Sequence, residues 1–485
     1  MNSLVFPDVA LLPLLPLLVI TATAVAVLIA DFFTEGPDYD VLGWIGLVGL
    51  ACAVLCAVPL WNQSETTLAG VLALDRYGLF FTVLFCLGSG LTLLLSMNYL
   101  ETTDIRCGDY YTLILFSTVG MVLMAVSLDL VVIFLGLEVM SIAAYALAGI
   151  WRTQVRSNEA ALKYFVLGAF ASGFLLLGIA FLFGASGETL LPRIAEVAAK
   201  GSADQRLLLT AGAALLLVGF GFKVAAAPFH SWAPDVYEGA PTAITAFMAA
   251  GIKAAAFAAF VRVFVDSLGP LAGDWQNAVW VLAVLTMTVG NVSALVQRNI
   301  KRLLAYSSIA HAGYLLVGLV AGGKSGAAAV LFYLTVYTLM TLGAFAVVIA
   351  LGRRGQPNED LDHWAGVALR RPFLGFAMTV FMLSLAGVPP LAGFMGKFYL
   401  FSAALEAGYV WLTVIAVVNS LVSVYYYVGV LVKMYMAEGV TEVEAPTARP
   451  YLFAALLATL GGTFLLGLFP TPWFEIARRS VESLI

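Results

Sequence analysis

The chain has 485 residues, of which 62% are hydrophobic and only 11% are charged, against about 25% charged residues in soluble domains. This composition excludes a soluble globular protein, and the lack of a basic arm or basic domain argues against a nucleic-acid partner. The net charge of -5 says little about partners, because most charges fall in the short segments between apolar runs. We therefore expect an integral membrane protein.

Apolar runs of the roughly 20 residues that span a bilayer as a helix recur along the chain, without the alternating segments that build a barrel. The first run lacks a charged leading region and a small-residue cleavage site, so we interpret it as a membrane helix rather than a removable signal. We predict fourteen membrane helices, at 8–30, 41–61, 76–99, 109–126, 128–150, 157–184, 206–228, 241–266, 275–296, 302–321, 326–351, 372–405, 408–434 and 450–470. An even number places both termini on the same side of the membrane.

Two of the predicted helices cannot be regular. In the seventh, Pro228 follows Lys223, and a proline lacks the N–H group and crowds the carbonyl four residues earlier. In the twelfth, Pro389 and Pro390 precede Lys397. Backbone groups freed by such breaks are tolerated only where they are buried in protein or face a water-filled cavity. Interrupted helices in matching halves, each with a lysine, are typical of ion-transporting folds.

The lysines and arginines of the loops predict the orientation, because cytoplasmic loops carry an excess of them. If both termini face outward, the inner side holds twelve loop cations, namely Arg106, Arg152, Arg156, Arg298, Lys301, Arg302, Arg353, Arg354, Arg370, Arg371, Lys433 and Arg449. The outer side holds seven, namely Arg76, Arg193, Lys200, Arg206, Lys324, Arg478 and Arg479. We expect a multi-pass protein of the bacterial inner membrane with both termini in the periplasm.

Five cations fall inside predicted helices, where a charged side chain costs at least a few kcal/mol and normally faces the bundle interior with a partner or a task. Arg262 lies close enough to a helix end for its guanidinium to reach the interface. The other four are Lys163, Lys223, Lys253 and Lys397. Because burial disfavours the charged amine, such lysines are candidates for proton exchange at physiological pH.

Glu138 lies about ten residues into the fifth predicted helix, hence about 15 Å along its axis and near the middle of the membrane. Lys163 lies near the inner end of the sixth helix, and we expect the two side chains to pair across neighbouring helices. The pair has two interpretations. It either holds the helices together as a structural ion pair, or it lets the carboxylate set the charge state of the lysine.

Two histidines add groups that titrate near neutrality. His311 lies in the middle of a helix beside Ser307 and Ser308, small polar residues that can support water, and we interpret it as a candidate proton relay. His230 follows the break after Lys223 and is a second candidate for the same task.

The four cysteines, Cys52, Cys56, Cys86 and Cys107, include no C-x-x-C pair, and three of them lie in apolar helices. We interpret them as packing residues. No iron–sulfur, haem or nucleotide signature accompanies them, so we expect neither a metal nor a redox cofactor on this chain.

Five segments resemble the proton-translocating antiporter-like subunits of respiratory complex I. They are FGFKVAAAPFHSWAPDVYEGAPT (220–242), QRNIKRLLAYSSIAHAGYLL (297–316), SLAGVPPLAGFMGKFYLF (384–401), LDLVVIFLGLEVMSIAAYALAGI (128–150) and EAALKYFVLGAFASG (159–173). The chain length and the fourteen helices are most similar to the subunit N branch of this family in bacterial NADH-quinone oxidoreductase, rather than to a longer paralogue with a lateral helix.

The resemblance implies an all-α membrane fold with two inverted five-helix repeats, each with one discontinuous helix. These are 109–266 and 267–435, flanked by N-terminal helices in 1–108 and a C-terminal helix in 436–485. It also implies that Glu138, Lys163, Lys223, Lys253 and Lys397 match the proton-translocating residues of the family. NADH, FMN, iron–sulfur clusters and quinone would then be bound by partner subunits, and the partners would be other membrane subunits of the complex, including neighbouring antiporter-like subunits.

A second function stays open on the sequence alone. Subunits of multisubunit cation/proton antiporters share these motifs and the same lysine chemistry but need no electron donor. A quinone-binding redox enzyme in its own right is excluded by the lack of cofactor ligands in the sequence.

Overall fold

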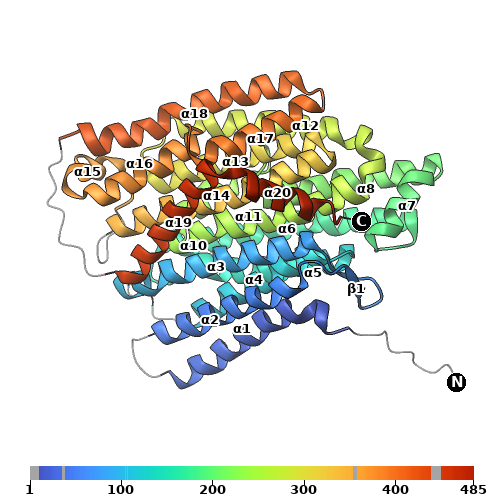
Figure 1. Cartoon of the computed structure of the whole chain (residues 1–485), viewed down its shortest axis with the longest axis horizontal. Coiled ribbons are helices and arrows are strands. Elements are labelled where there is room, and N and C mark those ends of the chain that lie inside the picture. The colour runs from blue at the N-terminus through green and yellow to red at the C-terminus, as the bar shows by residue number, and fades with distance from the viewer. Residues whose placement is uncertain are drawn as a thin grey trace.

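The computed structural model describes residues 10–34, 39–103, 105, 108–352, 358–438 and 449–484. Its long helices run side by side in one bundle, with α1 and α2 along one edge and α18 along the other (Figure 1). The helices are α1 Leu15–Phe33, α2 Asp40–Ala57, α3 Arg76–Thr103, α4 Asp109–Val126, α5 Leu130–Ala148, α6 Val155–Ser186, α7 Leu191–Lys200, α8 Ala203–Lys223, α9 Trp232–Gly239, α10 Thr242–Phe247, α11 Lys253–Phe260, α12 Ala272–Ala294, α13 Ile300–Ala321, α14 Gly323–Leu351, α15 Val367–Arg370, α16 Pro372–Ala386, α17 Ala392–Glu406, α18 Val410–Met436, α19 Pro450–Leu468 and α20 Pro470–Val481.

Within the described residues, thirteen helices are long and apolar enough to cross a membrane. The remaining predicted pass, at 372–405, is divided between the shorter helices α16 and α17. The all-α fold class is confirmed. Two predicted helices are each split in two. The seventh ends at Lys223 and resumes as α9, and the twelfth is interrupted between Ala386 and Ala392, because the prolines end the helices at these points.

Short elements that hydropathy does not reveal lie at the ends of the bundle. Strands β1 (Glu65–Thr67) and β2 (Leu72–Leu74) form an antiparallel hairpin before α3. The hairpin residue Thr67 donates to the carbonyl of Ala10 at 3.2 Å, and Ser483 accepts from the N–H of Tyr77 at 3.2 Å. Ala10 therefore lies at the hairpin that precedes α3, and Ser483 lies at the first turn of α3.

The helices α5 and α13 begin in the same way. The side chains of Asp129 and Asn299 cap α5 and α13 by accepting from the backbone N–H groups two and three residues on. The preceding helices approach closely, since a Cβ on Gly120 would lie 2.5 Å from the carbonyl oxygen of Gly136, and one on Gly290 would lie 2.6 Å from a backbone nitrogen of α13. The start of α5 pairs with the chain before α7, whereas the start of α13 contacts the end of α9.

The centre of the bundle is the pass formed by α10, a π-helical segment at Met248–Ile252, α11 and a second π-helical segment at Val261–Ser267. Every residue from 241 to 264 is buried, including Lys253 and Arg262. This pass therefore carries two buried cations through the centre of the bundle.

Candidate functional site

The break after α8 is buried in protein, as the sequence requires. Residues 224–227 are at most 2% exposed. The N–H of Ala227 donates to Thr286 Oγ1 on α12 at 2.9 Å, and the indole N–H of Trp232 donates to the carbonyl of Phe222 at 3.0 Å. Backbone groups that the helix leaves free are thus satisfied by side chains, which makes the break tolerable in a bilayer.

Lys223 ends α8 and is bound by hydroxyl groups of α5. Its Nζ donates to Ser141 Oγ at 2.8 Å and to Tyr145 Oη at 3.0 Å, and the residue is 3% exposed. Glu138 lies one turn before Ser141 on the same face of α5. A hydroxyl accepts from an ammonium and also donates to a neutral amine, so this pocket accommodates both charge states of Lys223. The two hydroxyls follow Glu138 at helical spacing, a signal present in the sequence that the prediction missed.

The predicted pairing of Glu138 with Lys163 is wrong. Glu138 accepts from Ser172 Oγ at 2.5 Å, whereas Lys163 Nζ lies 2.6 Å from Glu159 Oε1 and 2.7 Å from Asp235 Oδ2. Ser172 is nine residues beyond Lys163 on α6, which corresponds to about 14 Å along the helix axis. Glu138 and Lys163 are therefore at different depths, and their helices do not bring the two charges together.

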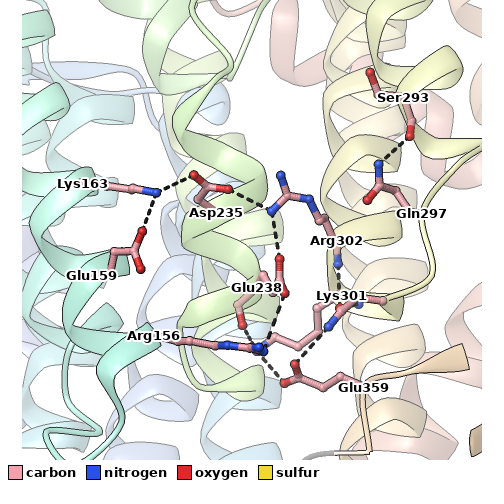
Figure 2. Close-up of polar contacts among 11 residues, drawn as sticks. Arg156, Glu159, Lys163, Asp235, Glu238, Ser293, Gln297, Lys301, Arg302 and Glu359 are labelled. Atoms are coloured by element: carbon pink, nitrogen blue, oxygen red, sulfur yellow. Dashed lines mark hydrogen bonds and ion pairs between the residues drawn. The ribbon is translucent and has the colours of Figure 1, made fainter.

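Lys163 instead lines a polar cavity of about 200 Å³, which we call the charged vestibule. It is lined by Arg156, Glu159, Ala160, Lys163, Asp235, Glu238 and Gly239. Figure 2 shows these charges continuing to Arg302, which lies 2.9 Å from both Asp235 and Glu238. The Lys163 side chain is 39% exposed, so it is not one of the buried cations of the bundle interior, where the sequence analysis grouped it.

Lys253 and His311 lie on one polar line in the second half of the chain. Lys253 Nζ donates to the carbonyl oxygen of Ser308 at 2.5 Å and also binds its hydroxyl. His311, one turn further along α13, is 1% exposed and has both ring nitrogens bound, Nδ1 to Tyr333 Oη at 2.5 Å and Nε2 to Tyr427 Oη at 3.0 Å. The two tyrosines come from α14 and α18, and no sequence pattern links them to His311.

Lys397 binds the C-terminal end of α16, the helix that precedes the break. Its Nζ donates to the carbonyls of Leu385 and Ala386 at 3.0 and 2.9 Å and to Ser420 Oγ at 2.8 Å. A cation is favoured at a helix C-terminus by the free carbonyls and the helix dipole. The same ammonium lies 4.9 Å from the ring centroid of Tyr314, whose ring packs edge-on against His311. Lys253, His311 and Lys397 thus form a line of buried polar groups.

His230 is not part of this line. It lies in the break between α8 and α9 and is partly buried, and its Nδ1 has no hydrogen-bond partner among the described residues.

Arg262 does not reach the interface, contrary to the sequence prediction. It is 1% exposed, and its guanidinium binds both carboxylate oxygens of Asp75 at 3.1 and 2.9 Å and the carbonyl of Ala125 at 3.0 Å. The Tyr77 ring covers it at 4.8 Å. Because Asp75 precedes α3, the pair joins the N-terminal helices to the central pass.

The described cysteines lie apart from these charges. Cys86 is buried in the core, Cys52 is exposed and Cys56 is intermediate, while Cys107 lies outside the described residues. In the described ranges, three or more His, Cys, Asp or Glu side chains nowhere gather as a metal site would require.

Comparison with known proteins agrees with this geometry. The family described as NADH:quinone oxidoreductase/Mrp antiporter, TM, matches residues 127–423, more than half of the chain. The NADH-quinone oxidoreductase subunit N of Trichlorobacter lovleyi is 46% identical over 477 residues, covering 98% of each chain. A chain of respiratory complex I from Thermus thermophilus is 37% identical, with a TM-score of 0.81 over 96% of this chain and 99% of that one. A chain of the Mrp complex from a Dietzia species, 21% identical with a TM-score of 0.85 over 98% of this chain and 97% of that one, shows the fold alone.

Interrupted helices with buried lysines and the matching family define an antiporter-like, proton-translocating membrane subunit. Sequence identity to curated relatives over nearly the full length shows which family within this class the chain belongs to. The chain belongs to the subunit N family of NADH-quinone oxidoreductase.

Proposed function

We propose that protons cross this subunit by way of Glu138, Lys163, Lys223, Lys253 and Lys397, with His311 as a relay between the last two lysines. The observation that carries the proposal is the pocket of Lys223, a buried amine held by two hydroxyls that serve either of its charge states. His230 is a weaker candidate, because it lies off the line. The proposed repeats are 109–266 and 267–435.

The subunit takes part in NADH-quinone oxidoreductase without redox chemistry of its own. Its partners are the other membrane subunits of the complex, and NADH, FMN, iron–sulfur clusters and quinone are bound by partner subunits. The transfer of protons through buried titratable groups is the part of the activity that we assign to this chain.

A cation/proton antiporter subunit without redox partners is the less supported alternative. It rests on a structural likeness at 21% identity, whereas the relatives named subunit N are about twice as similar in sequence over nearly the full length.

We further propose that both termini face the periplasm. Of the inner-side cations, Arg106, Arg353 and Arg354 lie outside the described residues. Others gather at one end of the bundle, where Arg156 and Arg302 flank Glu238. Reporter fusions after residues 355 and 485 should therefore report opposite sides of the membrane, and the same location for both would contradict the topology.

Glu138 and Lys223 should behave as a coupled pair, because Glu138 lies on the face of α5 whose Ser141 and Tyr145 bind Lys223. Glu138→Gln and Lys223→Met should each weaken proton pumping, and the double variant should lose less than the sum of the two losses. The matched control combines Glu138→Gln with Lys163→Met, which the structure places apart. The measurement is proton uptake into proteoliposomes at equal complex content, and additive losses for Glu138 and Lys223 would mean independent roles.

A further inference from the structure

Helix α9 is held from two sides by charge (Figure 2). Asp235 Oδ2 lies 2.7 Å from Lys163 Nζ on α6, and Asp235 Oδ1 lies 2.9 Å from Arg302 Nη1 on α13. Helix α6 belongs to the first proposed repeat and α13 to the second. Asp235 is therefore a carboxylate that the two repeats share, on the short helix that follows the break.

The two cations that hold Asp235 are not equivalent. Arg302 also binds Glu238 of the same helix at 2.9 Å, so it stays attached to α9 if one contact is lost. Lys163 has its second partner, Glu159, on its own helix at 2.6 Å. If its contact with Asp235 opens, Lys163 still keeps its ion pair with Glu159. Since ion pairs between partly exposed side chains are weak, the contact between Lys163 and Asp235 is the one that opens easily.

An aromatic stack links residues next to the charged vestibule with Lys223. Trp232, one turn before Asp235, stacks on Tyr164 with ring centroids 4.5 Å apart and planes 7° apart, and on Phe222 with centroids 5.2 Å apart. Tyr164 adjoins Lys163 in sequence, and its ring centroid lies 5.9 Å from Lys223 Nζ. Lys223 is 3% exposed and is not among the residues that line the vestibule. The stack therefore adjoins both the vestibule residues Lys163 and Asp235 and the buried amine.

From this arrangement we infer that Asp235 is a positioning residue that controls proton access from the charged vestibule to Lys223. While Lys163 binds Asp235, α9 presses Trp232 against Tyr164 and the amine is closed off. When Lys163 turns to Glu159 alone, α9 tilts about the break at 224–231 and water reaches the amine. The inference rests on the proposed function, since access matters only if Lys223 exchanges protons.

We call the hold of Asp235 on α9 the latch. Backbone hydrogen exchange in the assembled complex tests it. In Asp235→Asn, which keeps the side-chain shape but loses both ionic contacts, amides in residues 224–239 should exchange several-fold faster. Protons pumped per electron should fall while quinone reduction continues. The matched control is Asp274→Asn, because Asp274 binds Arg206 at 3.0 and 3.2 Å and likewise joins the two repeats, through α12 and α8. It should leave exchange in 224–239 unchanged.

Unchanged exchange in Asp235→Asn, or an equal increase in Asp274→Asn, would overturn the latch. If Asp235→Asn fails to assemble, Lys163→Met takes its place, because it removes the contact of Asp235 with Lys163 and leaves the contact with Arg302. Lys163→Met must then accelerate exchange in the same segment for the inference to stand. The exchange readout is separate from the proton-carrier role. If Lys223→Arg pumps normally while Asp235→Asn accelerates exchange, the latch holds and the proposed role of Lys223 fails.

Discussion

Replacement of Lys223 by arginine should leave an assembled complex that has lost most of its proton translocation. Arginine preserves the positive charge but cannot release its proton, because its pKa stays above about 12. In the wild-type chain, the hydroxyls of Ser141 and Tyr145 serve the amine in either state, so the loss falls on the exchange of the proton rather than on the charge. Quinone reduction should slow as well if electron transfer and pumping are tightly coupled.

The matched control for this variant is Lys433→Arg. Lys433 lies outside the proposed row and forms a partly exposed ion pair with Asp362, so a permanent cation there keeps its partner and should preserve pumping. Lys223→Ala should also lose proton pumping, because it removes the charged group altogether. Pumping is measured in proteoliposomes at matched complex content. Activity of Lys223→Arg close to wild type would make Lys223 a fixed structural cation.

Replacement of His311 by glutamine should lower proton translocation by about a hundredfold, the smaller end of what a positioned proton-transfer group contributes. Glutamine still offers a donor and an acceptor to Tyr333 and Tyr427, but it cannot take up and release a proton near neutral pH. The connection from Lys253 to Lys397 is then interrupted while the core remains filled.

His230→Gln makes the same change off the polar line and should have little effect on the proton flux. Both variants are compared by the initial rate of proton uptake, with complex assembly checked in the same membranes. Equal rates for His311→Gln and wild type would show that the histidine only joins α13 to α14 and α18.

The membrane passes were predictable because hydropathy is local to each segment, and the breaks because a proline acts within one turn of its own position. The pairing of Glu138 was not, since it depends on how deep each helix lies relative to its neighbour. Arg262 illustrates the same limit, as its partner Asp75 is 187 residues away in the chain. Asp235 stood in a segment that the family resemblance already included. Its importance appears only when α6 and α13 are placed on either side of α9.

The end of α16 makes the two helix breaks chemically unequal. Three acceptors surround Lys397, two of them carbonyls that can never donate, and an ammonium has three N–H groups to match them. Loss of one proton leaves an acceptor at the helix end without a donor. Lys223 lies before its break rather than after it and faces two hydroxyls that can reverse their hydrogen bonds. Proton release therefore costs a hydrogen bond at the second break but not at the first, so the two amines differ in how their surroundings must rearrange when they exchange a proton.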